Sequence, residues 1–285
     1  MKPLNVALIY RSRSPNDGAE TRAKVGLWSY PVPEFTWREY GLGRNFTVRR
    51  SDFAGFDVIF HEDWICGVFE GPGGPPIAYW VVDSNTSERR FGVYRRYARQ
   101  FNAVLVDQDQ LGGWPRPAYR LPYAVNDRLF KPLQKTVDVG YYVEPTPERN
   151  ELGAWLGDFC RGKGYSFDAA HGLPAAGYAA KLGAARIVVH LSTHPQCRTH
   201  RLFDALACGA CFLTFPLPMV DGDGFTEGEQ YLEWRSREEL GYLIKSLLDS
   251  GTWQTAAAAG HKFVMEHHTW AKRAPKLHRI LSRLV

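Results

Sequence analysis

Short, mostly apolar runs recur along the chain, and polar or glycine-containing stretches separate them. The runs show no regular alternation of apolar and polar residues, which is typical of strands buried on both faces of a parallel sheet. The pattern predicts strands at Val6–Tyr10, Asp57–Phe60, Ile77–Val82, Ala103–Val106, Val137–Val143, Ile187–Leu191 and Cys211–Phe215.

Helical patterns lie between these strands. Phe91, Tyr94, Ala98 and Phe101 recur at helical spacing and form one apolar stripe. The arginines of the same segment fall away from that stripe and line an outward face: Arg89, Arg95, Arg96 and Arg99. Because strands alternate with helices, the sequence predicts an α/β fold.

The pattern starts afresh near the middle of the chain. Two prolines and several polar residues precede the strand that begins at Val137. The sequence therefore predicts an N-terminal domain over residues 1–130 and a C-terminal domain over residues 131–285. The end of the chain, His261–Val285, is typical of a basic amphipathic helical tail with a break at Pro275, and we expect it to pack back on the N-terminal domain.

The composition is that of a soluble globular protein, since 45% of the 285 residues are hydrophobic and 23% are charged. No apolar run approaches the ~20 residues that a membrane helix needs, and the first run is too short for a signal peptide. Five cysteines, an odd number, do not suggest a disulfide framework. We expect a cytoplasmic protein without a membrane span, in the host cytoplasm if it is viral, and its oligomeric state stays open.

The formal net charge of +5 lies entirely in the N-terminal half. Residues 1–135 carry 19 Lys and Arg against 14 Asp and Glu, whereas residues 136–285 carry 16 of each. Such an asymmetry indicates an anionic partner for one half of the chain. A solvated helix face is the alternative explanation, because much of the excess lies in residues 87–100.

The segment H-P-Q-C-R-T-H-R-L-F-D-A-L-A-C-G-A-C, residues 194–211, has two interpretations. Its histidines and cysteines, together with His190, are residue types that bind zinc. However, residues 201–207 have helical spacing, and Cys208 and Cys211 lie where that helix ends and the next strand begins. Cysteines in this setting act as small buried hydrophobes, so we expect no metal site.

The second interpretation is a loop that leads into a ligand-binding helix. We expect this helix to begin near Thr199, an N-cap residue, so that its free N–H groups suit a diphosphate. Arg198 and Arg201 can add charge-assisted hydrogen bonds to phosphate oxygens. Asp204 lies little more than one turn into the helix, where its carboxylate can accept two hydrogen bonds from the vicinal hydroxyls of a ribose.

Several ordered blocks in about the last hundred residues resemble group-1 glycosyltransferases of the spore-maturation-protein-like branch. The segment R-L-F-D-A-L-A-C-G, residues 201–209, resembles the family signature R-x-F-E-A-x-A-C-G. The segments F-T-E-G-E at 225–229, R-E-E-L at 237–240 and H-T-W-A-K-R at 268–273 resemble later blocks of the family in the same order. The first half resembles the family only in outline.

The resemblance implies a GT-B fold, in which two Rossmann-like domains have parallel sheets facing a central cleft and the C-terminal domain holds a nucleotide sugar. It implies that Asp204 binds the ribose and that Gln196 contacts the donor sugar, where the family has a carboxylate. It also implies a diphosphate contact for Arg149, for which a surface position at a helix start is the alternative. In the first half, Asp17 and Gly18 occupy the position of the family's glycine-rich loop near the reacting groups.

We therefore expect a metal-independent glycosyltransferase, a hexosyl- or pentosyltransferase without a cofactor, that uses a UDP-sugar. A helix N-terminus and arginines can stabilise the departing diphosphate without a cation. An inverting reaction needs a general base, for which Asp83, Asp63 and His61 are candidates because they follow predicted strands. Asp83 is the first choice, and an N-cap role is its alternative. A retaining reaction needs no such base.

The acceptor stays open at this level. The positive N-terminal half, with tryptophans in or near its loops and the outward arginines on its phosphate side, suits a phosphate-bearing acceptor. DNA carrying a hydroxymethylated base is one hypothesis, and a lipid-linked or protein acceptor is another. Because Gln196 replaces a carboxylate, the rival function is a non-catalytic nucleic-acid-binding protein on a degenerate GT-B scaffold.

Overall fold

The computed structural model describes residues 2–11, 32–42, 46–62, 67–81, 88–107, 111–192, 199–217 and 221–285. The chain divides into two compact units, which we describe one at a time: unit 1 comprises Met1–Tyr123 and Trp270–Val285, and unit 2 comprises Ala124–Thr269. Unit 2 thus begins before residue 131, and the C-terminal segment is grouped with the N-terminal residues.

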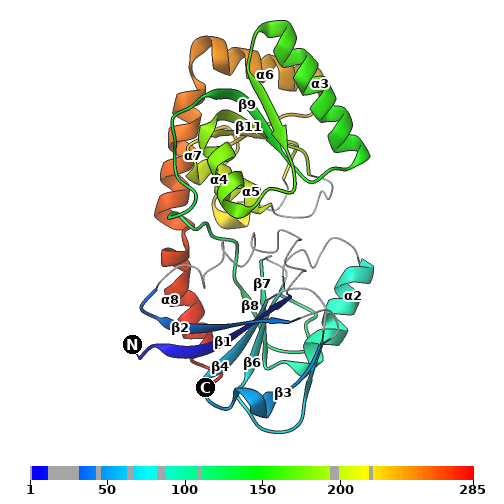
Figure 1. The fold of residues 1–285 in the computed structure, drawn as a ribbon, viewed down its shortest axis with the longest axis vertical. Helices are drawn as coiled ribbons and strands as arrows, with labels where there is room; N and C mark the ends of the chain where they lie inside the picture. The colour runs from blue at the N-terminus through cyan, green and yellow to red at the C-terminus, as the bar shows by residue number, and fades with distance from the viewer. Residues whose placement is uncertain are drawn as a thin grey trace. The chain divides into compact units, whose positions relative to one another are not determined.

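Unit 1 is built on a six-stranded sheet in the order β2-β1-β4-β6-β7-β8, in which every neighbouring pair is parallel (Figure 1). The four inner strands lie where apolar runs predict them, and the two outer strands do not. The strands are β1 (Leu4–Arg11), β2 (Phe35–Leu42), β4 (Val58–Glu62), β6 (Ile77–Val81), β7 (Ala103–Val106) and β8 (Ala118–Arg120). The strands β3 (Thr47–Arg49) and β5 (Val68–Glu70) form a separate parallel pair.

Helix α2 (Glu88–Tyr97) continues into the 3-10 turn η3 (Ala98–Gln100) and connects β6 to β7. Three residues of the predicted apolar stripe, Tyr94, Ala98 and Phe101, are buried in the core of unit 1, whereas Phe91 is half-buried and packs on Trp114. Tyr79 of β6 points into the same core and meets the ring of Phe101, with ring centroids 4.7 Å apart.

Helix α8 (Trp270–Leu281) lies on the opposite face of the same sheet. Trp80 follows Tyr79 in β6 and therefore points away from α2, and its ring meets Trp270 edge-on at a centroid distance of 5.7 Å. The predicted break at Pro275 is wrong, since α8 runs through this residue and the helix boundary falls at residues 268–269. The proline removes one helical hydrogen bond, and burial of the apolar face of α8 offsets that loss.

Unit 2 is built on a five-stranded parallel sheet in the order β10-β9-β11-β12-β13. Its strands are β9 (Val137–Tyr142), β10 (Phe167–Ala170), β11 (Ala185–His190), β12 (Cys211–Thr214) and β13 (Leu232–Glu233). Its helices are α3 (Pro147–Lys163), α4 (Ala175–Ala184), α5 (His200–Ala207), α6 (Arg237–Ser250) and α7 (Trp253–His267). Leu152 and Leu156 of α3 and Leu240 and Ile244 of α6 pack with Val139 of β9 in one core on one face of this sheet.

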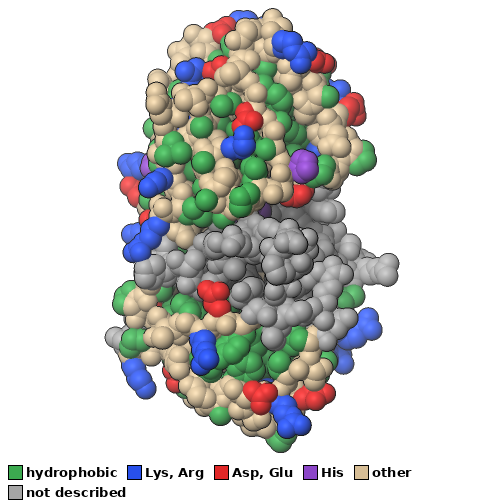
Figure 2. Space-filling model, viewed as in Figure 1, with side chains coloured by type: hydrophobic (Ala, Val, Ile, Leu, Met, Phe, Trp, Pro, Cys, Tyr) green, Lys and Arg blue, Asp and Glu red, His purple; other side chains and the backbone are tan. Residues whose placement is uncertain are grey.

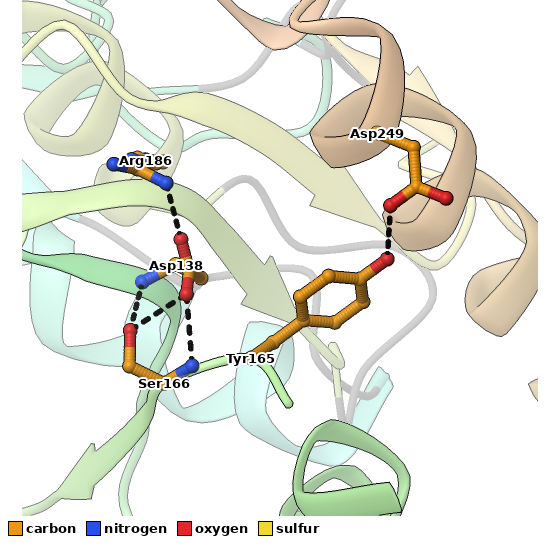
Figure 3. Close-up of polar contacts among 5 residues, drawn as sticks. All are labelled: Asp138, Tyr165, Ser166, Arg186 and Asp249. Atoms are coloured by element: carbon orange, nitrogen blue, oxygen red, sulfur yellow. Dashed lines mark hydrogen bonds and ion pairs between the residues drawn. The ribbon is translucent and has the colours of Figure 1, made fainter. Parts of the chain in front are cut away.

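The amino edge of the unit 2 sheet is held together by Asp138, which joins three strand starts (Figure 3). One oxygen of its carboxylate accepts hydrogen bonds from the N–H and the hydroxyl of Ser166, each at 2.8 Å. The other oxygen lies 2.5 Å from Nη1 of Arg186, the second residue of β11. Tyr165 adds a 2.5 Å hydrogen bond to Asp249 at the end of α6. These contacts fix the register of β9, β10 and β11.

The two units differ in charge, although lysine and arginine side chains lie at the surface of both on the face shown in Figure 2. Unit 1 carries 21 Lys and Arg against 13 Asp and Glu, a formal charge of +8. Unit 2 carries 14 against 17, a formal charge of −3. The C-terminal segment sharpens the asymmetry, because residues 270–285 contain five basic and no acidic residues. None of the helices in the described part of the chain is long and apolar enough to cross a membrane.

Candidate functional site

The carboxyl edge of the unit 2 sheet contains a topological switch point. The chain leaves β9 through α3 toward β10, and it leaves β11 through α5 toward β12 in the opposite direction. β9 and β11 are neighbours in the sheet, so the starts of α3 and α5 lie at adjacent strand ends. Open α/β sheets bind ligands at this kind of position.

Two arginines brace this switch point from opposite sides. Arg149, the third residue of α3, donates from Nε to the carbonyl oxygen of Leu191 after β11, at 3.0 Å. Arg201, the second residue of α5, donates from Nε to the carbonyl oxygen of Tyr142 at the end of β9, also at 3.0 Å. Each guanidinium thus bonds to the strand that precedes the other arginine. Arg149 makes a second bond from Nη1 to the carbonyl oxygen of Glu144, at 3.2 Å.

The two guanidinium groups form a positive site. Among the described residues, neither of them makes an ion pair with a carboxylate. Burial lowers the pKa of Arg149, and the charge of Arg201 lowers it further. Two positive charges that are near enough for one to lower the pKa of the other attract an anion. A planar guanidinium can bind the oxygens of a phosphate through two parallel hydrogen bonds.

The starts of α3 and α5 have the same capping geometry. The hydroxyl of Thr199 accepts a hydrogen bond from the backbone N–H of Arg201, at 3.3 Å, so the predicted N-cap is confirmed. The hydroxyl of Thr146 accepts one from the backbone N–H of Arg149, also at 3.3 Å. Both positive helix ends therefore lie at the edge where the two arginines meet, which adds to the attraction for an anion.

Asp204 lies one turn beyond this edge and is buried, with 6% of its surface exposed. Burial raises the pKa of its carboxyl group well above the usual value, and the charge of Arg201 opposes that rise. Tyr178 of α4 is buried near Asp204 and Arg201, and its hydroxyl has no hydrogen-bond partner among the described residues. The charge of Asp204 adds to burial in raising the pKa of Tyr178. A desolvated carboxylate that accepts few protein hydrogen bonds is suited to accept them from a ligand.

Two further groups line the strand ends and were not proposed as donor-binding residues from the sequence. Tyr141 is 4% exposed, its hydroxyl has no partner among the described residues, and burial raises its pKa to about 12. His190 stacks on Phe212, and burial together with the charges of Arg201 and Arg149 lowers its pKa well below the usual value. The imidazole is therefore neutral beside the arginine pair. In the sequence, Tyr141 was marked only by its place in a predicted strand, and His190 only as a residue of the zinc-binding type.

The described cysteines of unit 2 are packed in its core. Cys208 and Cys211 are at most 1% exposed, and burial raises the pKa of each thiol to about 12. A thiol in such surroundings stays protonated, whereas a zinc ligand is a thiolate. Among the described residues, no group of three His, Cys, Asp or Glu side chains is placed to hold a metal ion. His194 and Cys197 lie outside the described residues.

A model of the family described as glycosyl transferase-like matches residues 139–279. The matched stretch contains Arg149, Arg201 and Asp204 and is just under half of the chain. No curated protein matches the sequence significantly.

Several solved structures match over nearly the whole length of both chains. HepE from Anabaena, determined in complex with UDP-glucose, has a TM-score of 0.67 at 12% identity and covers 99% of this chain and 100% of its own. Sucrose-phosphate synthase from Thermosynechococcus elongatus has a TM-score of 0.60 at 13% identity and covers 99% of each chain. A glycosyltransferase from Rickettsia africae has a TM-score of 0.62 at 8% identity and covers 100% of this chain and 99% of its own. The fold is GT-B.

The GT-B assignment confirms the fold class predicted from the sequence, with one Rossmann-like parallel sheet in each unit. The structure brings four predicted donor-binding residues to the carboxyl edge of the unit 2 sheet: Arg149, Thr199, Arg201 and Asp204. Gln196 and Arg198, the other two, lie outside the described residues.

In unit 1 of this GT-B fold, His61 is enclosed by aromatic rings and is not exposed. Its Nδ1 lies 3.2 Å from the carbonyl oxygen of Ile9, and its Nε2 lies 3.2 Å from the hydroxyl of Tyr97. Burial lowers the pKa of His61 to about 4. The catalytic hypothesis for His61 therefore needs correction, because a base must contact the acceptor and this ring is inside the core.

The remaining candidates of unit 1 fall into two groups. Asp17, Gly18, Asp63 and Asp83 lie outside the described residues. Arg89 lies in α2, and its side chain is not described. Arg95, Arg96 and Arg99 are exposed at the C-terminal end of α2 and in η3, where the described structure places no catalytic candidate beside them.

Proposed function

We propose that this protein is a glycosyltransferase that moves a sugar from a nucleoside diphosphate donor, with a UDP-sugar favoured, to an acceptor hydroxyl. The observation that carries the proposal is the reciprocal brace of Arg149 and Arg201 at the switch point of unit 2. The glycosyl transferase-like match over the same residues supports it, as does the fold shared with HepE, whose structure contains UDP-glucose.

The described residues suggest which side chains bind the diphosphate and the ribose of the donor. The guanidinium groups of Arg149 and Arg201 and the capped start of α5 bind the diphosphate. The carboxylate of Asp204 accepts hydrogen bonds from the ribose hydroxyls. Gln196, by its resemblance to the family motif, contacts the donor sugar.

The reaction breaks the bond between the anomeric carbon and the diphosphate oxygen and joins that carbon to the acceptor oxygen. Negative charge develops on the departing diphosphate, and preorganised cations and N–H dipoles stabilise it most where water is excluded. We propose that the two guanidinium groups and the two helix starts at the carboxyl edge of the unit 2 sheet supply this stabilisation, and that the transfer needs no metal ion. If the reaction inverts configuration, Asp83 or Asp63 accepts the proton of the acceptor hydroxyl.

We propose an anionic acceptor for unit 1, with DNA that carries a hydroxymethylated base as the specific candidate. The formal charge of +8 on unit 1 supports a phosphate-bearing partner. A lipid-linked or protein acceptor is the other outcome that the test below separates.

Two measurements test the function. Calorimetric titration with UDP should show binding to the wild-type protein, and incubation with UDP-sugars and hydroxymethylated or plain DNA should give a sugar-sized mass increase on the hydroxymethylated DNA alone. Absence of UDP binding contradicts the donor assignment. UDP binding with hydrolysis of the donor but no DNA product retains the transferase and removes the DNA acceptor.

The second candidate function is a nucleic-acid-binding protein without catalysis on the GT-B scaffold. The amide of Gln196, where the family has a carboxylate, is the observation that favours it. Salt-dependent DNA binding without any effect of UDP or of UDP-sugars is the result expected for this function.

A further inference from the structure

Three of the arginines that the sequence places on the phosphate side of the acceptor line a pocket in unit 1, which takes no part in the proposed bond-breaking step. Arg95 and Arg96 of α2 and Arg99 of η3 line it, together with Gly92 and Pro115, and its volume is about 300 Å³. All three arginines are exposed. Within the described part of the chain, none of them forms an ion pair with a carboxylate, and the described residues that line the pocket include no acidic side chain. We call this feature the arginine pocket.

The loop of residues 111–117 packs against α2 and closes one side of the arginine pocket. Arg116 donates hydrogen bonds from Nε and Nη2 to the carbonyl oxygen of Arg99, at 3.2 and 2.8 Å. The guanidinium of Arg95 lies over the ring of Phe91, 5.5 Å from its centroid, and Trp114 meets that ring edge-on at 5.2 Å. The loop is therefore tied to the backbone of η3, and the guanidinium of Arg95 is placed against Phe91, so two sides of the arginine pocket are fixed.

The topology places the arginine pocket far from the reacting edge of unit 1. α2 connects the carboxyl end of β6 to the amino end of the parallel neighbour β7, so its C-terminal end lies at the amino edge of the sheet. Ten residues of α2 span about 15 Å at 1.5 Å per residue. Ligands of open α/β sheets react at the carboxyl edge, so a small acceptor cannot occupy both positions.

We propose that the arginine pocket binds the phosphodiester backbone of a nucleic acid and anchors it at a distance from the reacting groups. The inference rests on the proposed function in one respect, namely that the anchored nucleic acid is the acceptor. A separation of about 15 Å corresponds to roughly four to five base pairs at 3.4 Å per step, so one short duplex can reach both edges of the sheet.

The composition of the pocket favours a phosphodiester over a membrane surface. All three cationic side chains among its described lining residues are arginines, and arginine binds phosphate oxygens through a planar fork. The rings of Phe91 and Trp114 pack against each other and are partly buried, whereas membrane binding uses exposed apolar side chains. The formal charge of +8 on unit 1 supplies the long-range attraction that nucleic acids require.

The test compares two triple variants that remove the same charge from the same unit. One carries Arg95→Gln, Arg96→Gln and Arg99→Gln, and the control carries Lys272→Gln, Arg279→Gln and Arg283→Gln on exposed positions of the C-terminal segment. Binding of an unmodified 20-base-pair duplex is measured by fluorescence anisotropy at several salt concentrations.

The pocket variant should bind the duplex roughly tenfold more weakly or worse, and its slope of log affinity against log salt should be smaller by about 2 to 3. The control variant should lose much less affinity. Equal losses in the two variants overturn the proposal, because they indicate attraction to the whole unit. Failure of the wild type to bind the duplex, or pocket-dependent binding of phosphatidylserine vesicles without duplex binding, also overturns it.

UDP binding by the same variants separates this inference from the proposed function. Loss of duplex binding with unchanged UDP affinity is the expected result for the pocket variant. A wild-type protein that binds the duplex through the pocket but does not bind UDP contradicts the donor site and retains the pocket. A wild-type protein that binds UDP but not the duplex retains the donor site and contradicts the proposal for the arginine pocket.

Discussion

The Nε atom of Arg201 donates a 3.0 Å hydrogen bond to the carbonyl oxygen of Tyr142, which ties the start of α5 to the end of β9. The bond restrains the plane of the guanidinium. A guanidinium held in this way loses little side-chain entropy when it binds phosphate. The arrangement explains why an arginine suits this position better than a lysine.

Arg201→Gln should weaken UDP binding about 10- to 100-fold, because charge-assisted hydrogen bonds contribute about 1.5–3 kcal/mol. Arg161→Gln is the matched control, since Arg161 is an exposed arginine of unit 2 that pairs with Asp158 at the far end of α3. Calorimetric titration with UDP measures both variants. If the two variants bind UDP with the same affinity as the wild type, Arg201 does not contact the diphosphate.

Asp204→Asn should stabilise the protein and at the same time weaken UDP binding. The pKa of Asp204 is higher in the folded than in the unfolded state, so folding takes up a proton and stability falls as the pH rises above about 4. The asparagine variant does not titrate and should melt a few degrees above the wild type at neutral pH, with the difference vanishing near pH 4. Thermal unfolding across this pH range measures the first effect, and titration with UDP at neutral pH measures the second. If the variant melts at a higher temperature but binds UDP with the affinity of the wild type, Asp204 does not contact the ribose.

Much of the fold could be predicted from the pattern of apolar residues, and the strands that were missed in the two large sheets share one property. β2 and β8 are the outer strands of the unit 1 sheet, and β10 and β13 are the outer strands of the unit 2 sheet. An outer strand is bonded on one side only and is partly exposed, so its sequence mixes polar with apolar residues. The segment F-T-W-R-E-Y-G-L of β2 mixes polar and apolar residues and therefore does not have the continuous apolar pattern that predicts a buried strand.

The candidate site could be predicted only as far as its separate parts. The start of α5 at Thr199 follows from N-cap chemistry, and the positions of Arg149 and Arg201 after two strands follow from the strand pattern. Their hydrogen bonds across the switch point depend on β9 and β11 being neighbours, which one sequence does not show. The burial of His61 was missed for a similar reason, because the aromatic residues around it come from distant segments.

His61→Phe should remove part of the acid sensitivity of unit 1. The pKa of His61 falls from 6.5 to about 4 on folding, so the unfolded state binds a proton more readily than the folded state in this window. Stability from this group is therefore fully present above about pH 6.5 and is lost as the pH falls toward 4, by up to about 3 kcal/mol. Urea unfolding at pH 7 and at pH 4.5 should show a smaller difference for the variant than for the wild type. An unchanged difference assigns the acid sensitivity to other groups.

Asp138→Ala should destabilise unit 2 without changing the donor site. The alanine removes the acceptor of both Ser166 bonds and the partner of Arg186 at the amino edge, and the expected loss is about 1–3 kcal/mol. Asp138→Asn is the matched control, because an amide oxygen can still accept from Ser166 but carries no charge for Arg186. Since Arg186 is partly exposed, the ion pair contributes little, and the asparagine variant should unfold between the wild type and the alanine variant. Urea unfolding measures this order of stability.

UDP affinity, measured at urea concentrations below the unfolding transition, should be the same for all three proteins. The reason is that Asp138 and the brace of Arg149 and Arg201 lie at opposite edges of the sheet. If the variants lose UDP affinity in the same order as they lose stability, the donor site depends on the register of β9. The hydrogen bonds of Arg149 and Arg201 are then not sufficient to hold the donor site in place.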